Sequence, residues 1–229
     1  MRSLLAIIGM TLFYPIFVLL LLITTRLFAE ARYLPSETMQ PTLNVGDRVL
    51  VEKVKTFLKR PYNRGEIIVF YPPPMEMGGK DLSWDVMHVL GRLTGLPFLP
   101  YEPAFIKRVI GLPGDNIRIV SGQGVFLNGK RLEETSYIKE QPHYSLTTFQ
   151  DIGGRSIDGS IIQPYRNLSN EQKLIVVPPG QLFVLGDNRN NSEDSHVFGM
   201  VSEERVIGCV TMKFWPVLRI IDPPTDHAG

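Results

Sequence analysis

The chain has 229 residues, of which 24 are lysine or arginine and 23 are aspartate or glutamate, so the net charge is +1. These charges are spread evenly, and no basic field indicates nucleic acid as a partner. A single cysteine excludes an internal disulfide and a cysteine-based metal cluster, and the four histidines lack ligand spacing, so no zinc site is predicted.

Residues 4–24 contain no charged side chain. As a helix rising 1.5 Å per residue, such a segment spans about 30 Å, the thickness of the hydrocarbon core of a bilayer. Residues 25–28 (TRLF) lack the small side chains of a cleavage site. We therefore predict a retained membrane anchor over residues 1–28, followed by one domain over residues 29–229.

The next feature is a loop at residues 34–43 (LPSETMQPTL), followed by a turn and a strand centred on Val49. Two prolines bracket two hydroxyl residues, and each proline disfavours a helical conformation in the residue before it. The pattern predicts a fixed, extended loop that holds small polar side chains still. Such a loop suits hydrolysis near a membrane surface, although the pattern alone is equally consistent with an ordinary turn.

Runs of β-branched and aromatic residues between glycines and prolines predict further strands. These runs are 65–71, 104–110, 117–120, 125–127, 174–177, 181–185 and 204–214. Residues 75–100 form an insert with a short amphipathic helix, for which we expect Asp81 as the N-cap and Gly95 as the stop. The insert is either a packed surface helix or a flap near the membrane or the substrate. A variable second β region is expected over residues 121–175, with an exposed polar stretch at 133–171.

Two polar features interrupt the later strands. Lys107 lies in the apolar run FIKRVI, and strand alternation predicts that Lys107 and Arg108 face opposite sides, so that only one of them reaches water easily. Residues 186–199 (GDNRNNSEDSHVFG) are dense in polar side chains between two strands. This density is typical of a hydrogen-bonded loop at the edge of a site.

Three stretches, taken as an ordered set behind an N-terminal anchor, resemble the type I signal peptidases. They are residues 35–42 (PSETMQPT), 105–117 (FIKRVIGLPGDNI) and 186–199. These are membrane-bound serine proteases that remove signal peptides with a serine and lysine dyad. The similarity covers most of the chain from residue 34 to residue 208, apart from the insert and the polar stretch. Two details are most similar to the cyanobacterial and thylakoid branch of this family: the sequence VGDRVLVEKV, and DSH in place of the commoner DSR.

The resemblance implies a mainly β fold, with a single transmembrane helix before a β domain that has a second, smaller β region. The core strands are expected near Val49, Ile68, Ile106, Ile117, Leu182 and Val206. It also implies a single-pass integral membrane protein with its catalytic domain in the periplasm, the thylakoid lumen or the cell exterior. The partners would be membrane lipid and the signal peptides of exported preproteins, which would be cut after small residues in A-x-A-like sites without a metal or cofactor.

Matching the family pattern residue by residue places the nucleophile at Thr38, where the family has serine, and the general base at Lys107. By the same resemblance, Ser36 would stabilise the oxyanion and Ser192 would orient the lysine. The polar scaffold behind the lysine would be Arg108, Asp187, Arg189 and Asp194. The pockets for small substrate side chains would be lined by Leu34, Met39, Phe105 and Ile106.

Threonine at the nucleophile position leaves two hypotheses open. Its extra methyl group stiffens χ1 and crowds an attack geometry built for a primary hydroxyl. Either Thr38 is an adapted nucleophile in a working peptidase, or the protein is a catalytically weak or inactive homologue that binds signal peptides or a membrane partner. The retained Ser36, Lys107 and Ser192 favour the first. Attack by Ser36 itself is disfavoured, because two residues along an extended strand move a side chain by about 6–7 Å.

Overall fold

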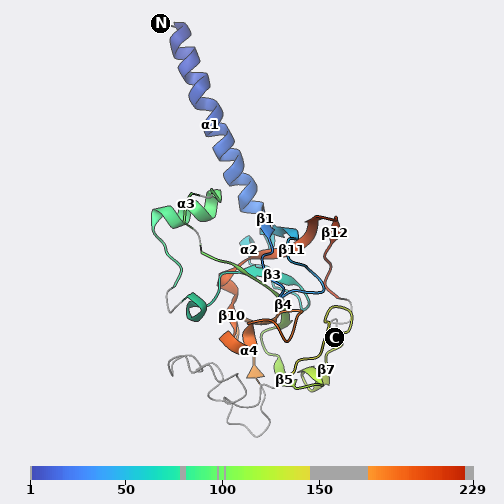
Figure 1. Cartoon of the computed structure of the whole chain (residues 1–229). Helices are drawn as coiled ribbons and strands as arrows, with labels where there is room; N and C mark the ends of the chain where they lie inside the picture. The colour runs from blue at the N-terminus through green and yellow to red at the C-terminus, as the bar shows by residue number, and fades with distance from the viewer. Residues whose placement is uncertain (1, 78–80, 97, 101, 145–174, 225–229) are drawn as a thin grey trace.

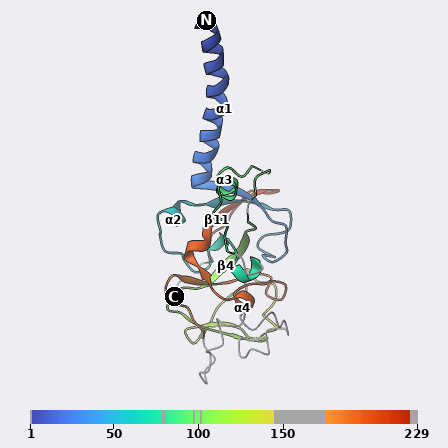
Figure 2. The ribbon, with the colours of Figure 1, turned by 90° about the vertical axis from the view of Figure 1, so that its left-hand side faces the viewer.

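The computed structural model describes residues 2–77, 81–96, 98–100, 102–144 and 175–224, which form a long N-terminal helix and a mainly β domain (Figures 1 and 2). The helices are α1 (Arg2–Phe28), α2 (Val54–Phe57), η1 (Pro74–Met77), α3 (Val86–Thr94), α4 (Ser195–Phe198) and η4 (Glu203–Arg205). The strands are β1 (Ala29–Tyr33), β2 (Arg48–Glu52), β3 (Ile67–Phe70), β4 (Phe105–Gly111), β5 (Asn116–Val120), β6 (Gly124–Leu127), β7 (Lys130–Arg131), β8 (Ile175–Val176), β9 (Gln181–Leu185), β10 (Val201–Ser202), β11 (Val206–Trp215) and β12 (Arg219–Ile220). The predicted mainly β fold class is confirmed.

The described strands form two antiparallel sheets. The larger sheet has eight strands in the order β1-β2-β11-β3-β4-β9-β10, with β12 paired to β11, and the smaller has the order β7-β6-β5-β8. The prediction placed the strand near Ile117 in the main core, but Ile117 pairs with Leu127 and Ile175 in the smaller sheet. The short loops at residues 121–123 and 128–129 favour this local pairing. The expected variable region therefore supplies β6, β7 and β8, while residues 145–174 lie outside the described residues.

Strands β3, β4 and β9 form the centre of the larger sheet. Every residue of β3 is buried, and so are residues 107–111 of β4. These strands are runs of isoleucine, valine, phenylalanine and leucine, which fit a sheet covered on both faces. Phe70, at the end of β3, packs against two other rings: its ring centre lies 6.2 Å from that of Phe105 and 6.3 Å from that of Phe198. A rigid centre of this kind fixes the positions of the side chains on β4.

Helix α1 runs directly into β1, a strand that the sequence analysis did not predict. Strand β1 pairs with β2 in the larger sheet, with Ala29 opposite Glu52, so the end of α1 is attached directly to that sheet. Within the described part of the chain, no helix combines the length and the apolar composition needed to cross a membrane. The predicted helix over residues 4–24 is confirmed, and its passage through a membrane stays a prediction.

The expected helix of the insert is present as α3, but its N-cap differs from the prediction. The cap is Asp85, whose carboxylate accepts hydrogen bonds from the backbone N–H groups of Met87 and His88. Asp81 instead forms an ion pair with Arg205. The stop at Gly95 is confirmed, because Gly95 adopts the left-handed conformation (φ 63°) that ends many helices.

We expect Phe70→Ala to lower the free energy of unfolding by about 3–5 kcal/mol, because it removes a fully buried ring and leaves a cavity among Phe105 and Phe198. Urea unfolding of the purified chain in detergent, followed by circular dichroism, measures the change. Phe57→Ala is the matched control: Phe57 is 76% exposed, and its loss should change stability by no more than about 0.5 kcal/mol. Equal effects of the two substitutions would contradict this account of the core.

Candidate active site

The loop at residues 34–43 is turned, and the prediction that it is extended was wrong. Backbone hydrogen bonds run from Gln40 N–H to Glu37 O (3.0 Å) and from Leu43 N–H to Met39 O (2.9 Å). The turn brings the hydroxyl oxygens of Ser36 and Thr38 to within 3.3 Å of each other. The argument that an extended chain separates these two hydroxyls therefore fails.

Lys107 projects from the central strand β4 and is only 3% exposed. Its ammonium nitrogen donates a hydrogen bond to Ser192 Oγ at 2.8 Å, across 85 residues of sequence. Burial lowers the pKa of Lys107 below its ordinary value, and the nearby carboxylates, led by Asp194, oppose that shift. The environment therefore favours the neutral amine more than water does.

Arg108, the next residue on β4, is also buried, so the prediction that one of the two cations reaches water easily was wrong. The guanidinium makes a two-point contact with the Asp187 carboxylate at 2.7 and 2.6 Å and donates to Gly65 O at 2.8 Å. Its charge lies 4.2 Å from the centre of the Tyr137 ring. The alternation of the strand was right, but a carboxylate takes the place of water on this side.

The loop after β9 packs directly against the hydroxyl loop. Asn188 N–H donates to Thr38 O at 3.0 Å, and the Asn188 side-chain amide donates to Glu37 O at 3.2 Å. Gly186 allows this close approach: a Cβ there would lie 2.2 Å from Ser192 Oγ and 2.6 Å from Thr38 O. The two loops therefore place Thr38 and Ser192 in a fixed relation to each other.

Arg189 is held by a carboxylate that the sequence analysis missed. Both terminal guanidinium nitrogens of Arg189 contact Glu134, and its Nε donates to Gly186 O at 3.1 Å. Tyr137 O–H donates to the same Glu134 carboxylate at 2.8 Å. The spacing of Glu134 and Tyr137 in a polar stretch was the only sequence signal, and it is too common to identify a partner for Arg189.

Asp194 is fully buried and forms an ion pair with His196. Its other carboxylate oxygen accepts a hydrogen bond from Gly186 N–H at 2.9 Å. Burial alone would raise the pKa of Asp194, but the charge and the hydrogen bond of His196 hold that pKa below its usual value. The imidazole ring of His196 stacks on Tyr144 with 3.9 Å between ring centres. The four predicted scaffold residues thus lie in one region, divided among three separate ion pairs.

A cleft of about 1090 Å³ joins these groups. Ser36, Thr38, Lys107 and Ser192 all line it, and so do the four residues predicted to form substrate pockets, which are Leu34, Met39, Phe105 and Ile106. In the described ranges, no group of three or more histidine, cysteine, aspartate or glutamate side chains is placed to hold a metal ion. The arrangement offers three hydroxyls, a buried amine and apolar walls, which together suit acyl transfer through a hydroxyl nucleophile.

Comparison with known proteins shows the family of the chain. Residues 7–215 match the family model described as signal peptidase, peptidase S26. The chain belongs to this signal peptidase family. Probable signal peptidase I-2 of Synechocystis sp. is 38% identical over 84% of this chain and 66% of its own length. Signal peptidase I of Leptolyngbya laminosa is 37% identical, over 87% of this chain and 76% of its own length.

Thylakoidal processing peptidase 1 of Arabidopsis thaliana is 29% identical, over 85% of this chain and 44% of its own length. The predicted likeness to the cyanobacterial and thylakoid branch of the signal peptidases is therefore confirmed. The chain spans just under two thirds of the Synechocystis signal peptidase and less than half of the thylakoidal protein.

We expect Glu134→Gln to lower the free energy of unfolding by about 3 kcal/mol, because the guanidinium of Arg189 would stay buried without a charged partner. Urea unfolding of the chain in detergent measures the loss. The matched control is Glu133→Gln, the same change at an exposed neighbour, with an expected effect within about 0.5 kcal/mol. A loss at Glu134 no larger than at Glu133 would mean that the buried pair does not hold the loop.

Proposed function

We propose that this protein is a membrane-anchored endopeptidase that removes N-terminal signal peptides from exported preproteins after small residues. The observation that carries the proposal is the buried Lys107 amine, hydrogen-bonded to Ser192 in a cleft that also holds the hydroxyls of Ser36 and Thr38. Among the described residues, Lys107 forms no ion pair with a carboxylate, and its amine is hydrogen-bonded to the neutral hydroxyl of Ser192. A lysine in such a position suits a general base better than a structural cation.

In the proposed mechanism, Thr38 Oγ1 attacks the carbonyl carbon of the scissile peptide bond while the neutral Lys107 amine takes the hydroxyl proton. The resulting tetrahedral intermediate collapses, Lys107 returns the proton to the leaving amine, and an ester links the signal peptide to Thr38. A water molecule, deprotonated by Lys107, then hydrolyses the ester. An unperturbed lysine would favour the ammonium form at pH 7 by about 4–5 kcal/mol, so the base depends on the burial of Lys107.

Ser36 is proposed to stabilise the oxyanion that forms in this reaction. Its hydroxyl lies 3.3 Å from Thr38 Oγ1, within reach of an oxygen on the attacked carbon. A donor placed in advance for a developing oxyanion lowers the barrier by roughly 3–4 kcal/mol. Ser192 is proposed to orient the Lys107 amine, and the ion pairs of Arg108, Arg189 and Asp194 to hold the loop behind it.

The apolar walls of the cleft are proposed to select small side chains at positions −1 and −3 of the signal peptide. Leu34 and Met39 are 3% and 1% exposed, so they are packed into the core and offer the cleft shallow surfaces. Phe105 and Ile106 are half-buried at the start of β4, next to the base. Large substrate side chains would have to displace packed core residues, which costs more than binding would return.

The anchor is proposed to be α1, in a single-pass protein whose β domain lies on the extracytoplasmic side. Residues 4–24 carry no charge, and exposed apolar side chains occur on consecutive α1 residues such as Phe13–Tyr14 and Leu19–Leu21. A helix that is apolar on all sides belongs either in a protein core or in a bilayer. The proposed partners are membrane lipid and signal peptides, with no nucleic acid and no cofactor.

A second candidate function is the binding of signal peptides without cleavage, and the observation that favours it is the methyl group of Thr38. The 3.3 Å between the two hydroxyls also reopens Ser36 as the attacking group. The three possibilities predict different outcomes for the same set of variants.

Cleavage of a peptide with alanine at positions −3 and −1, by the full chain in detergent, separates them. We expect Thr38→Ala and Lys107→Ala to abolish cleavage, and Thr38→Ser to keep or raise the rate, because serine removes the crowding methyl. Ser36→Ala should lower the rate by on the order of 10² to 10³ and leave it measurable, since it removes one oxyanion donor.

Three results would contradict the proposal. Full activity of the Lys107→Ala variant would show that Lys107 is not the general base. Activity that survives in Thr38→Ala but vanishes in Ser36→Ala would make Ser36 the nucleophile. A wild-type chain that binds the peptide without cutting it would establish the binding function instead.

The pH dependence tests the role of Lys107. The rate should rise with pH as the Lys107 ammonium loses its proton. This rising limb of the pH–rate profile should lie below the ordinary pKa of lysine, because burial lowers the pKa of Lys107. Glu193→Gln should move the limb to lower pH, because the Glu193 carboxylate raises the pKa of Lys107. Glu204→Gln, at an exposed residue that does not line the cleft, is the control and should leave the limb in place. Identical profiles for all three proteins would count against Lys107 as the base.

A further inference from the structure

Helix α3 exposes the apolar side that a surface helix normally buries. Val86, Leu90 and Leu93 form one stripe at helical spacing, with Met87 at its edge, and all four are exposed. Trp84, just before the helix, and Phe98, just after it, are 78% and 76% exposed. The segment therefore carries a continuous set of exposed apolar side chains, defined here as the α3 stripe: Trp84, Val86, Met87, Leu90, Leu93 and Phe98.

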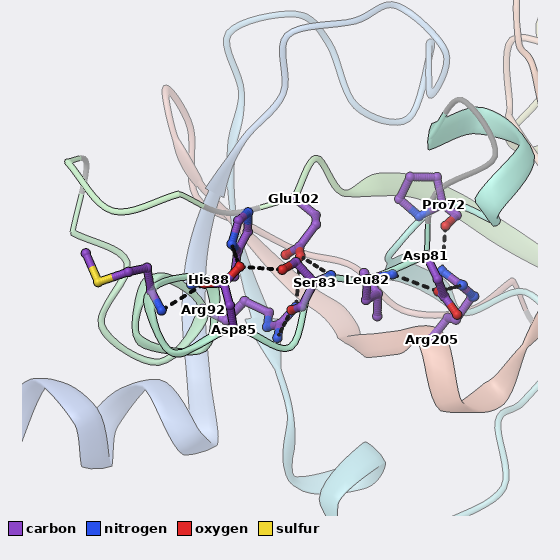
Figure 3. A network of polar contacts seen from close by, with 10 residues as sticks. Pro72, Asp81, Leu82, Ser83, Asp85, His88, Arg92, Glu102 and Arg205 are labelled. Carbon is purple, nitrogen blue, oxygen red and sulfur yellow. Dashed lines mark hydrogen bonds and ion pairs between the residues drawn. The ribbon is translucent and has the colours of Figure 1, made fainter.

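On its opposite side, α3 is held by a polar network to the chain segments directly before and after it (Figure 3). Arg92 donates to Glu102 at 3.0 Å and to Ser83 O at 2.7 Å, and Ser83 N–H donates to Glu102 at 3.0 Å. Gly91 is buried, and a Cβ there would lie 2.1 Å from Pro100 O. These contacts fix the orientation of α3 relative to its flanking segments, and in that orientation the stripe faces outward.

The far end of α3 is fixed against α1. The Arg26 guanidinium, in the last turn of α1, lies so close to Gly95 that a Cβ at Gly95 would be 1.9–2.0 Å from it. A cation at that place also complements the negative end of the α3 dipole. In both overall views α3 lies beside the domain end of α1 (Figures 1 and 2).

A second group of exposed apolar residues occurs at the same end of the domain. Trp215, Val217, Leu218 and Ile220, on and around β12, are all more than half exposed. Figure 1 shows β12 at the level where α1 enters the domain, on the other side of α1 from α3. Apolar surface on two sides of one helix matches a continuous sheet of lipid better than a single protein partner, which would cover one patch.

We propose that α3 lies in the headgroup region of the bilayer, with the α3 stripe in contact with lipid. The proposal rests on the proposed anchor, because a chain held through α1 must bring this end of the domain to the membrane surface. The inner side of α3 supplies Gly91, Arg92 and Gly95 to the wall of the cleft. Contact with lipid on one side of α3 therefore sets the mouth of the cleft at the membrane surface, where a membrane-inserted signal peptide emerges.

Tryptophan fluorescence of the full chain tests this contact without any substrate. The chain has two tryptophans, so Trp215→Phe leaves Trp84 as the single probe. The protein is reconstituted into phosphatidylcholine vesicles whose acyl chains are brominated near the headgroup. The control carries Trp84→Phe, Trp215→Phe and Val176→Trp, with the probe on an exposed residue of β8, in the sheet farther from α1.

Brominated lipid should quench the Trp84 emission at least several-fold more than the emission of the control probe, and aqueous acrylamide should quench it less. Leu90→Glu combined with Leu93→Glu should abolish the quenching by lipid, with an unchanged circular dichroism spectrum, because both residues are exposed in the fold. Equal quenching of Trp84 and the control probe would overturn the proposal. Protection from acrylamide without quenching by bromine would also overturn it, because a protein surface would then cover the stripe.

Flotation of the same samples separates this inference from the proposed function. Vesicles that carry the chain but leave Trp84 unquenched contradict the role of α3 and leave the anchor standing. A chain that does not float with the vesicles contradicts both. A chain with quenched Trp84 that cuts no peptide contradicts only the peptidase activity.

Discussion

A lysine can be as little as 3% exposed only where the surrounding structure is rigid, and much of this fold meets that requirement for Lys107. The residue lies on β4, which β3 and β9 flank in the sheet, and its hydrogen-bond partner Ser192 comes from the loop after β9. If either neighbour moved, water would enter and the pKa of Lys107 would return toward its ordinary value. The packing of the central strands is therefore part of the chemistry of the site as well as of its stability.

The ion pairs behind the site explain how so polar a loop stays in one conformation. Buried pairs of this kind contribute little net stability, because each charge loses its hydration. What these pairs provide is a preference for one loop conformation. Arg108 is paired with Asp187 and Arg189 with Glu134, and any conformation that separates either pair leaves a charge buried alone.

The strands and the residues of the site followed from the sequence to different degrees, for physical reasons. Runs of β-branched residues located β2, β3, β4, β9 and β11. The signal is strong in β3, β4 and β9, where burial on both faces makes almost every residue apolar. The resemblance brought Ser36, Lys107 and Ser192 together, which no local pattern could do. The pairing of Glu134 with Arg189 was missed, because it joins segments 55 residues apart in the chain. The turn at Thr38 is closed by local backbone hydrogen bonds, and it was missed because the two prolines around it were interpreted as signs of an extended chain.

The turned loop changes what a threonine at position 38 means. In an extended chain, its methyl group would be one more side chain facing the cleft, and the neighbouring serine would be out of reach. In the observed turn, Thr38 O is held by Asn188 and its hydroxyl lies next to that of Ser36, so the backbone already limits where Oγ1 can be. A β-branched residue has few χ1 rotamers, and a fixed backbone selects among them. Stiffness that would obstruct attack in a mobile loop therefore helps to hold the hydroxyl in place in this one.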